Sequence, residues 1–395
     1  MIFTTPLNGG DLGILQATKC LIEKYFPNSK LTIACFNYDT WSKQANAPQL
    51  GLIPELEDEI YAAKSNIGKQ ILSYTKYAIE RTNLSGWIFQ LYYFLFKSKS
   101  PYLQNLLHSD LVIASPGGYL HPYYGIENKT FQLSKLAKHK RKYVLLAQSI
   151  SPPPEPPIQQ KEKKLHGILK RATYIAARET KTFKNLNNYQ NSILTCDIVF
   201  LLADQITPKP KQNRKPTKIV CNFRKWPDTE ISKYVAFLNL VLNKYPEIQV
   251  EFLSTCQGIT GYVDDSLIAQ EIAQTLVDKN RITINQNIYT TTQLIEAFAD
   301  HDLYLGMRLH GAIFSMIGGI PAMNISYEEK GTALYGDLGI DKHAVSLQQP
   351  IHDWLESFDY IYNNYQNALQ LTTEAVRKGR EMADLNVNVI KNALE

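Results

Sequence analysis

The residue types best suited to chemistry lie together in one segment, from Asp302 to Lys330. A short apolar run leads directly into Arg308, Leu309 and His310, and an apolar helical pattern follows. Arginine presents a planar fork of donors to a carboxylate or phosphate, and histidine titrates near neutral pH. The start of a helix also exposes backbone amides that attract anions. The segment therefore predicts an anion site that contains an acid–base group.

Spacing alone leaves a structural role open for the same two side chains. Residues two apart do not share a face of a regular helix, so Arg308 and His310 converge only at an irregular first turn. In the structural alternative, His310 caps or braces the turn and Arg308 pairs with an acidic neighbour such as Asp302. The residue types and spacing do not decide between the two interpretations.

The elements that must position these residues are predicted from alternating apolar runs and amphipathic segments. Continuous apolar runs between helices are typical of parallel strands covered on both faces. We expect a short first strand at 2–4 and further strands at 31–36, 111–114, 143–148, 174–176, 218–222, 250–254, 281–284 and 303–306. We expect helices at 13–25, 131–138, 231–244, 265–276 and 291–299, and helical structure throughout 354–394.

A stretch rich in proline and cations divides the chain into two lobes. Residues 207–216 read TPKPKQNRKP, which is typical of an exposed connector. We therefore expect an N-terminal α/β lobe over 1–206, a linker over 207–216, a C-terminal α/β lobe over 217–350 and C-terminal helices over 351–395. Doubly wound, Rossmann-like lobes bind ligands at the carboxyl ends of their strands. The active site is accordingly expected in the cleft between the lobes.

The composition is that of an ordinary soluble globular protein. A net charge of +5 over 395 residues suits an anionic substrate and does not indicate nucleic-acid binding. The five cysteines lack a CxxC pair and the eight histidines are scattered, so we expect no metal site. Neither a P-loop nor a GxGxxG after a strand is present, so we expect no cofactor. The first residues lack a signal-peptide pattern, which predicts a cytoplasmic protein.

The most apolar aromatic window, GWIFQLYYFLF at 86–96, bears on membrane contact. It is too short to span a bilayer, which needs about 20 residues. We favour a buried helix. The alternative is an interfacial patch in peripheral contact with the inner face of the membrane.

Motifs along nearly the whole chain resemble those of the polysaccharide pyruvyltransferase family. The most specific is Arg308-Leu309-His310 followed by an apolar helix, the turn Gly319-Ile320-Pro321, Tyr327 and Lys330. Weaker matches, in the same order as in the family, are Asn8-Gly9-Gly10-Asp11, Ser115-Pro116-Gly117-Gly118, Gln148-Ser149-Ile150-Ser151-Pro152, Ala177-Arg178-Glu179 and Cys196-Asp197-Ile198-Val199-Phe200, the last as a strand. Two departures, the short stretch before Asn8 and the altered glycine triplet at Ser115, fall in the lobe expected to receive the acceptor.

The resemblance implies a GT-B-like fold and an enzyme that uses phosphoenolpyruvate as donor. The acceptor is then a sugar hydroxyl of a glycan or a lipid-linked precursor, and the product a pyruvate ketal. Arg308 is expected to grip the donor, His310 to act as acid–base or phosphate-binding partner, and Arg178 to supply a second cation. Further substrate contacts are expected from Gly117, Gly118, His121, Arg224, Asn8, Asp11, Glu329 and Lys330.

Several of the expected contacts also have a structural alternative. Asn8 and Asp11 are suited to capping the first helix. The glycines at 117 and 118 suit a turn, and Arg178 suits a salt bridge with Glu179.

Two other classes of function stay open. The first is a nucleotide-sugar glycosyltransferase of the same shape, in which Glu328 or Glu329 holds a ribose. The second is a non-catalytic role in the assembly of an exopolysaccharide. Stabilisation by UDP-sugars but not by phosphoenolpyruvate would favour the glycosyltransferase.

Overall fold

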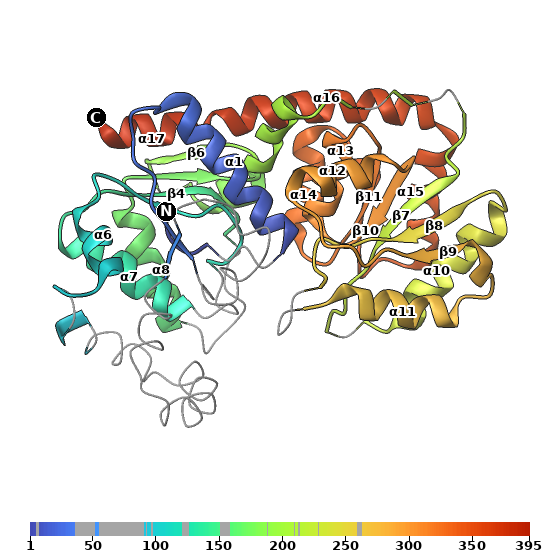
Figure 1. The fold of residues 1–395 in the computed structure, drawn as a ribbon, viewed down its shortest axis with the longest axis horizontal. Coiled ribbons are helices and arrows are strands. Elements are labelled where there is room, and N and C mark those ends of the chain that lie inside the picture. Colours follow the sequence, from blue (N-terminus) through green and yellow to red (C-terminus); the bar gives the residue numbers. More distant parts are fainter. Residues whose placement is uncertain are drawn as a thin grey trace. The chain divides into compact units, whose positions relative to one another are not determined.

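The computed structural model describes residues 1–4, 8–35, 52–54, 91, 93–95, 98–120, 126–150, 159–187, 189–208, 210–211, 214–227, 229–258 and 263–395. The chain forms two compact units, each described by itself (Figure 1). Unit 1 comprises Met1–Pro6, Leu21–Thr195 and Leu385–Glu395, and unit 2 comprises Leu7–Cys20 and Cys196–Asp384. The units differ from the predicted lobes in that residues 7–20 and 196–206 group with unit 2 and residues 385–395 with unit 1.

Unit 1 is built on a four-stranded parallel sheet in the order β3-β4-β5-β6. Strand β4 is buried along its whole length, as expected of an apolar strand covered on both faces. Helices α6, α7 and α8 cover one face, and α17 packs against β4 and β5. The strands are β3 (Val112–Ala114), β4 (Tyr143–Gln148), β5 (Tyr174–Ala177) and β6 (Ser192–Leu194). The helices are α6 (Pro101–His108), α7 (Ile126–Lys138), α8 (Gln159–Arg171), α9 (Thr180–Asn185) and α17 (Asn386–Leu394).

The start of the chain extends unit 1 without forming a regular strand. Ile2 and Thr4 make isolated parallel bridges to Ala114 and Cys35. The strand expected at 2–4 is therefore reduced to two bridges. Strands β1 (Ile33–Cys35) and β2 (Leu52–Pro54) pair in parallel as a separate two-stranded sheet. The bridge from Thr4 reaches the last residue of β1.

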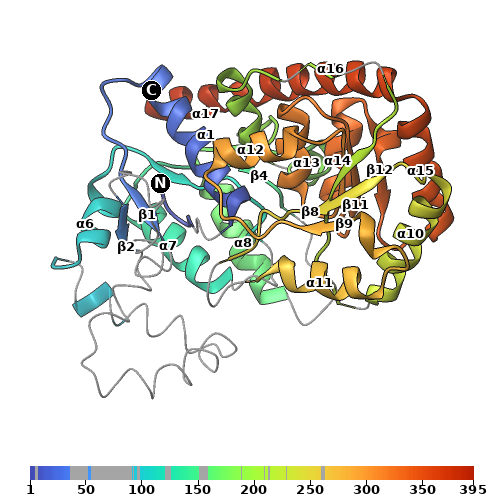
Figure 2. The same cartoon turned by 45° about the vertical axis from the view of Figure 1, so that its right-hand side comes forward.

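Unit 2 is built on a six-stranded parallel sheet in the order β12-β11-β10-β7-β8-β9. Helices α12, α13 and α14 cover one face, and α10, α11 and α15 pack against the other (Figure 2). The strands are β7 (Lys218–Asn222), β8 (Gln249–Phe252), β9 (Ile282–Ile284), β10 (Leu303–Gly306), β11 (Ala322–Ser326) and β12 (Ala344–Ser346). The helices are α10 (Ile231–Lys244), α11 (Asp265–Thr275), α12 (Thr291–Ala299), α13 (Leu309–Ile317), α14 (Glu329–Leu338), α15 (Ile351–Asn363) and α16 (Tyr365–Asp384).

The segment expected as a strand at 196–200 is a 3₁₀ helix instead, η2 (Ile198–Gln205). Asp197 caps it, because its Oδ1 accepts a hydrogen bond from the amide of Val199 at 3.1 Å. Such side-chain capping favours helical turns over an extended strand. Helix α16 packs against η2 within unit 2, and Arg380 forms two hydrogen bonds with Asp204, at 2.8 and 3.0 Å.

The apolar window at 86–96 is only partly within the described residues. Residues 91 and 93–95 are helical, and Leu91, Phe94 and Leu95 are exposed. The prediction of a buried helix is therefore wrong for these three side chains, although Tyr93 is buried. Within the described part of the chain, no helix has the length and apolarity needed to cross a bilayer.

Candidate active site

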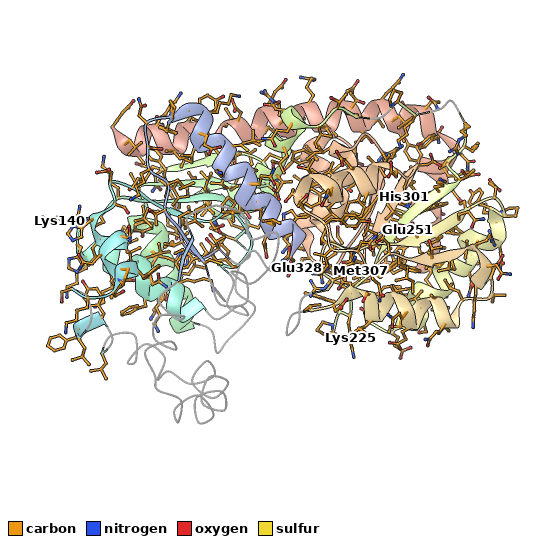
Figure 3. All side chains as sticks on the ribbon, viewed as in Figure 1. Lys140, Lys225, Glu251, His301, Met307 and Glu328 are labelled. Carbon is orange, nitrogen blue, oxygen red and sulfur yellow. The ribbon has the colours of Figure 1, made fainter. Side chains whose placement is uncertain are left out.

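Arg308 and His310 lie where β10 ends and α13 begins, at the carboxyl edge of the unit 2 sheet. The backbone of Arg308 is extended (φ −80°, ψ 112°) at the N-cap position, whereas His310 lies in the first helical turn. The backbone therefore changes from extended to helical between Arg308 and His310, which is the irregular first turn that the two side chains need in order to converge. Figure 3 labels the preceding residue, Met307, at this edge. The strand order reverses here, between β7 and β10, and doubly wound sheets bind ligands at such a switch point.

A buried carboxylate holds the Arg308 guanidinium in place. Nε of Arg308 donates to Asp265 Oδ2 at 2.8 Å, and Nη2 donates to Asp265 Oδ1 at 2.7 Å. Asp265 begins α11, is 2% exposed and also accepts a hydrogen bond from Ser254 at 2.7 Å. The acidic partner of Arg308 is therefore Asp265 and not Asp302, which lies 3.1 Å from Arg214.

This pairing leaves one edge of the guanidinium for a ligand. Among the described residues, Arg308 Nη1 makes no hydrogen bond, and the side chain keeps 13% of its surface exposed. Burial lowers the pKa of Arg308, but Cys256 and the Asp265 carboxylate raise it above its ordinary value. The charge is therefore permanent. A fixed cation with an open N–H edge suits a carboxylate or a phosphate.

His310 lies against a second buried carboxylate, that of Asp197. The distance from His310 Nε2 to Asp197 Oδ2 is 3.3 Å, and Asp197 is 1% exposed. The two atoms are close enough for an ion pair when the imidazole is protonated, but their alignment is not that of a hydrogen bond. The buried carboxylate therefore holds the imidazole from one side of the ring.

Glycines of α1 (Gly9–Tyr25) allow this helix to contact α13 at His310. A Cβ atom added to Gly10 would lie 2.3 Å from His310 Nδ1, and one added to Gly13 would lie 2.7 Å from the ring of Phe314. No side chain fits at either contact without displacing its neighbour. The early glycine motif and the Arg308-Leu309-His310 motif are thus brought together within unit 2.

Asn8 and Asp11 take the capping role that their positions at the start of α1 suggested. Asn8 Oδ1 accepts a hydrogen bond from the amide of Asp11 at 2.8 Å, and its amide group donates to the Asp11 carboxylate. Burial raises the pKa of Cys256 to about 12; Arg308 opposes the increase, and Asp265 and Asp11 add to it. Asp11 therefore lies close enough to the Arg308–Asp265 pair to act on the same thiol. Direct contact of Asn8 or Asp11 with substrate stays a prediction.

Arg224 lies in an aromatic clamp beyond the end of β7. Its guanidinium carbon is 5.0 Å from the ring centre of Trp226 and 4.8 Å from that of Tyr327. Nη1 of Arg224 donates to the Tyr327 hydroxyl at 3.1 Å, while the buried Nε has no hydrogen-bond partner among the described residues. Tyr327 also contributes to the raised pKa of Arg308, so the clamp lies near that residue.

Two buried asparagines flank the end of β10. Asn222 and Asn324 are both in register with Gly306, one on each neighbouring strand. Within the described part of the chain, Asn222 Oδ1 and Asn324 Nδ2 have no hydrogen-bond partner. Buried polar atoms of this kind are uncommon in proteins and are often found at functional sites.

Glu329 and Lys330 begin α14, beyond the end of β11. Lys330 forms an ion pair with Glu328, and Glu329 is exposed. Figure 3 labels Glu328 at this edge of unit 2. Lys330 therefore lies at the carboxyl edge of the unit 2 sheet, but its charge is paired with that of Glu328.

The expected residues of unit 1 lie at the carboxyl edge of its own sheet. Gly117 has a φ of 148°, a conformation that favours glycine, and its amide donates to Ala147 at 3.2 Å. Gly118 follows it after β3. Arg178 follows β5, is 4% exposed, donates to Ser149 Oγ at 2.8 Å and lies 3.7 Å from Glu179. His121 lies outside the described residues. Because Arg178 belongs to unit 1, its meeting with the unit 2 residues stays a prediction.

Comparison with known proteins agrees with these motifs. Residues 8–329 match the family model described as polysaccharide pyruvyl transferase. The amylovoran biosynthesis protein AmsJ of Erwinia amylovora is 26% identical over 213 residues, which are 53% of this chain and 48% of AmsJ. The alignment thus spans about half the length of that relative.

The fold is also found among solved structures. The S. aureus MnaA–UDP co-structure matches with a TM-score of 0.59 at 9% identity, over 97% of this chain and 93% of that one. A UDP-N-acetylglucosamine 2-epimerase from Listeria monocytogenes, described as putative, matches with a TM-score of 0.55 at 8% identity, over 94% and 90%. At such identities the likeness shows the fold alone: Rossmann-like α/β units of the GT-B-like kind, with a helical C-terminal segment, as the sequence predicted.

Proposed function

Because this chain belongs to the polysaccharide pyruvyl transferase family, we propose that it transfers the enolpyruvyl group of phosphoenolpyruvate to a sugar hydroxyl and closes a pyruvate ketal. The observation that carries the proposal is the pair of buried carboxylates that hold Arg308 and His310 at one sheet edge. This arrangement offers a fixed cation for a small anion and a protonatable ring beside it. The polysaccharide context of AmsJ supports a glycan or its lipid-linked precursor as acceptor.

In this proposal, Arg308 binds the donor through its Nη1 edge. Phosphoenolpyruvate carries a carboxylate and a phosphate on one short carbon frame. The Asp265 fork prevents the guanidinium from rotating, so the bound anion is oriented without a further loss of side-chain freedom. We also assign Arg224, in its aromatic clamp, to donor binding in unit 2, and Arg178 is the proposed contribution of unit 1.

His310 is the proposed acid–base group. Protonated His310 delivers a proton to the methylene carbon of the donor, which becomes a methyl group while positive charge develops at the neighbouring carbon. A sugar hydroxyl attacks that carbon and gives up its proton to the imidazole. Phosphate then departs, and a second hydroxyl attacks to close the ketal. The departing phosphate takes up the proton of the second hydroxyl and becomes hydrogen phosphate, so protons and charge balance.

Phosphate release from phosphoenolpyruvate, followed across a panel of glycans, tests the proposal. We expect release only with an accepting glycan, and loss of release in Arg308→Ala and His310→Gln. Arg377→Ala, at an exposed ion pair on α16, is the matched control and should keep full activity. Release that persists in both site variants would contradict the assignment.

The same experiment separates this proposal from the nucleotide-sugar alternative. Glu328, a candidate for gripping a ribose, is engaged by Lys330. We therefore expect phosphoenolpyruvate, and not UDP-sugars, to raise the unfolding temperature of the wild-type protein. Stabilisation by UDP-sugars alone would favour a glycosyltransferase.

A further inference from the structure

One turn of helix in unit 1 presents its apolar side chains outward. Leu91, Phe94 and Leu95 are 58%, 76% and 54% exposed. Their spacing of three and four residues places them on one face of the helix. Tyr93 is buried, and its hydroxyl bonds to His139 at the end of α7. The turn is therefore attached through Tyr93, while its apolar face stays in contact with solvent.

A cation of α7 lies against this apolar turn, and two further cations lie beside that cation. Lys135 Nζ lies 4.5 Å from the ring centre of Tyr93. Burial and the charge of Lys138 both lower the pKa of Lys135, as expected where cations crowd together. Lys135 also lines a hollow of about 580 Å³. The rest of its lining is Lys138 and three further residues of α7, together with Arg171 at the end of α8.

The run after α7 extends the positive surface. Lys138, Lys140, Arg141 and Lys142 are all exposed, and Figure 3 labels Lys140 at the outer edge of unit 1. Within the part of the chain that the structure describes, neither these four residues nor Arg171 forms a salt bridge with a carboxylate. The positive charge is thus not neutralised by the protein's own described acids.

The surface lies at the amino edge of the unit 1 sheet. Lys142 immediately precedes β4, and Arg171 ends the helix that leads into β5. Gly117 and Arg178 lie at the opposite, carboxyl edge of the same sheet. The surface therefore belongs to neither set of proposed substrate residues, and what it does is independent of the proposed reaction.

We propose that Leu91, Phe94 and Leu95, with the cations of α7, the run after it and Arg171, form a docking surface for an anionic phospholipid bilayer. Apolar side chains of a helix enter the boundary between headgroups and acyl chains, while neighbouring lysines and arginines meet lipid phosphates. Each such cation contributes about a factor of five to binding of an anionic membrane. The combination of an outward apolar turn and a positive rim is complementary to a negatively charged membrane surface.

Co-sedimentation of the full chain with vesicles tests this docking surface. We expect binding to vesicles that contain phosphatidylglycerol, little binding to phosphatidylcholine alone, and weaker binding as salt is added. Phe94→Ser with Leu95→Ser should remove most of the binding. Lys138→Glu with Arg141→Glu should weaken it at least about 25-fold, since two cations are lost.

Matched changes in unit 2 provide the controls. Leu267→Ser with Val277→Ser alters two exposed apolar residues, and Lys279→Glu with Lys378→Glu reverses two exposed cations. These proteins should bind vesicles as the wild type does, with unchanged unfolding temperatures in all variants. Equal binding by the unit 1 and unit 2 variants would overturn the proposal. Failure of the wild type to bind anionic vesicles at low salt would also overturn it. The same holds if the apolar variants keep vesicle binding and differ from the wild type only in self-association, measured by gel filtration.

Discussion

Asp197 Oδ2 lies 3.3 Å from His310 Nε2, and this contact joins two motifs that are far apart in the sequence. Asp197 caps η2, whereas His310 lies in the first turn of α13, and both belong to unit 2. The imidazole therefore has a buried carboxylate on one side and the backbone of Gly10 on the other. The ring is held by contacts from both sides rather than by its own helix.

Asp197→Asn should lower kcat for phosphate release by roughly 10- to 100-fold, because the imidazole loses the buried charge that holds it from one side. A loss of this size corresponds to about 1.4–2.7 kcal/mol of transition-state stabilisation. Initial rates at saturating phosphoenolpyruvate check this. Asp278→Asn, which disturbs an ion pair with Arg281, is the control and should leave kcat unchanged. An unchanged kcat in Asp197→Asn would mean that Asp197 is only structural.

Gly10→Ala should reduce activity by displacing the His310 ring. The new methyl group would lie 2.3 Å from Nδ1, so either the ring or α1 must move. Overpacking of this kind costs about 1–3 kcal/mol in stability. Gly336→Ala provides the comparison, because nothing lies within 4 Å of a Cβ at that helical position. We expect Gly336→Ala to keep activity and to unfold at the same or a higher temperature; equal activity of the two variants would contradict the tight contact.

Asp265→Asn should raise KM for phosphoenolpyruvate more than it lowers kcat. The amide can accept only one of the two Arg308 hydrogen bonds, so the guanidinium becomes free to rotate. Breaking a buried pair on one side also destabilises, by about 3–5 kcal/mol when the remaining charge is isolated. Asp302→Asn is the control, since Asp302 pairs with Arg214 and supports the other end of β10. That variant should unfold more easily while its KM stays unchanged.

His343→Leu should reduce the dependence of stability on pH. His343 is fully buried in η4 (Asp341–His343), and burial lowers its pKa from 6.5 to about 4. Between these values the unfolded chain binds a proton that the folded protein excludes. The free energy of unfolding therefore falls by up to about 3 kcal/mol as the pH drops from 6.5 to 4.

Urea unfolding at several pH values measures this effect. We expect the slope between pH 4 and 6.5 to be shallower in His343→Leu than in the wild type. His352→Gln, at an exposed position, should leave the slope as it is. Identical slopes in the wild type and His343→Leu would show that other groups dominate the acid response.

Most strands of the two sheets were predictable because they are continuous apolar runs between amphipathic helices, whereas the short strands β6 and β12 were not predicted. β4, β7 and β10 have the predicted bounds, as do α10 and α12. The strand at 196–200, expected from its resemblance to a strand motif of the family, is wrong, because the apolar run after Asp197 suits a buried 3₁₀ turn as well as a strand. Only the capping bond of Asp197, which depends on local geometry, separates the two.

The partners of the site residues were harder to predict than the residues themselves. Arg308 and His310 stand at a recognisable junction, but Asp265 is distant in the sequence and looks like an ordinary first residue of a helix. Its place after a predicted strand was a usable signal, since strand ends meet at one sheet edge. Trp226 gave no comparable signal, because its ring contacts depend on how the loop after β7 turns.

Helix α16 supports η2, the segment whose cap residue Asp197 contacts His310. Gly379 lies directly against the ring of Phe200, and a Cβ there would be 2.9 Å from it. With the Arg380–Asp204 bonds, this contact fixes η2, whose first cap is Asp197. A version of the protein shortened before α16 would lose this support behind the imidazole, and it would also lose α17, which packs against the unit 1 sheet. The C-terminal helices therefore belong in any minimal catalytic fragment.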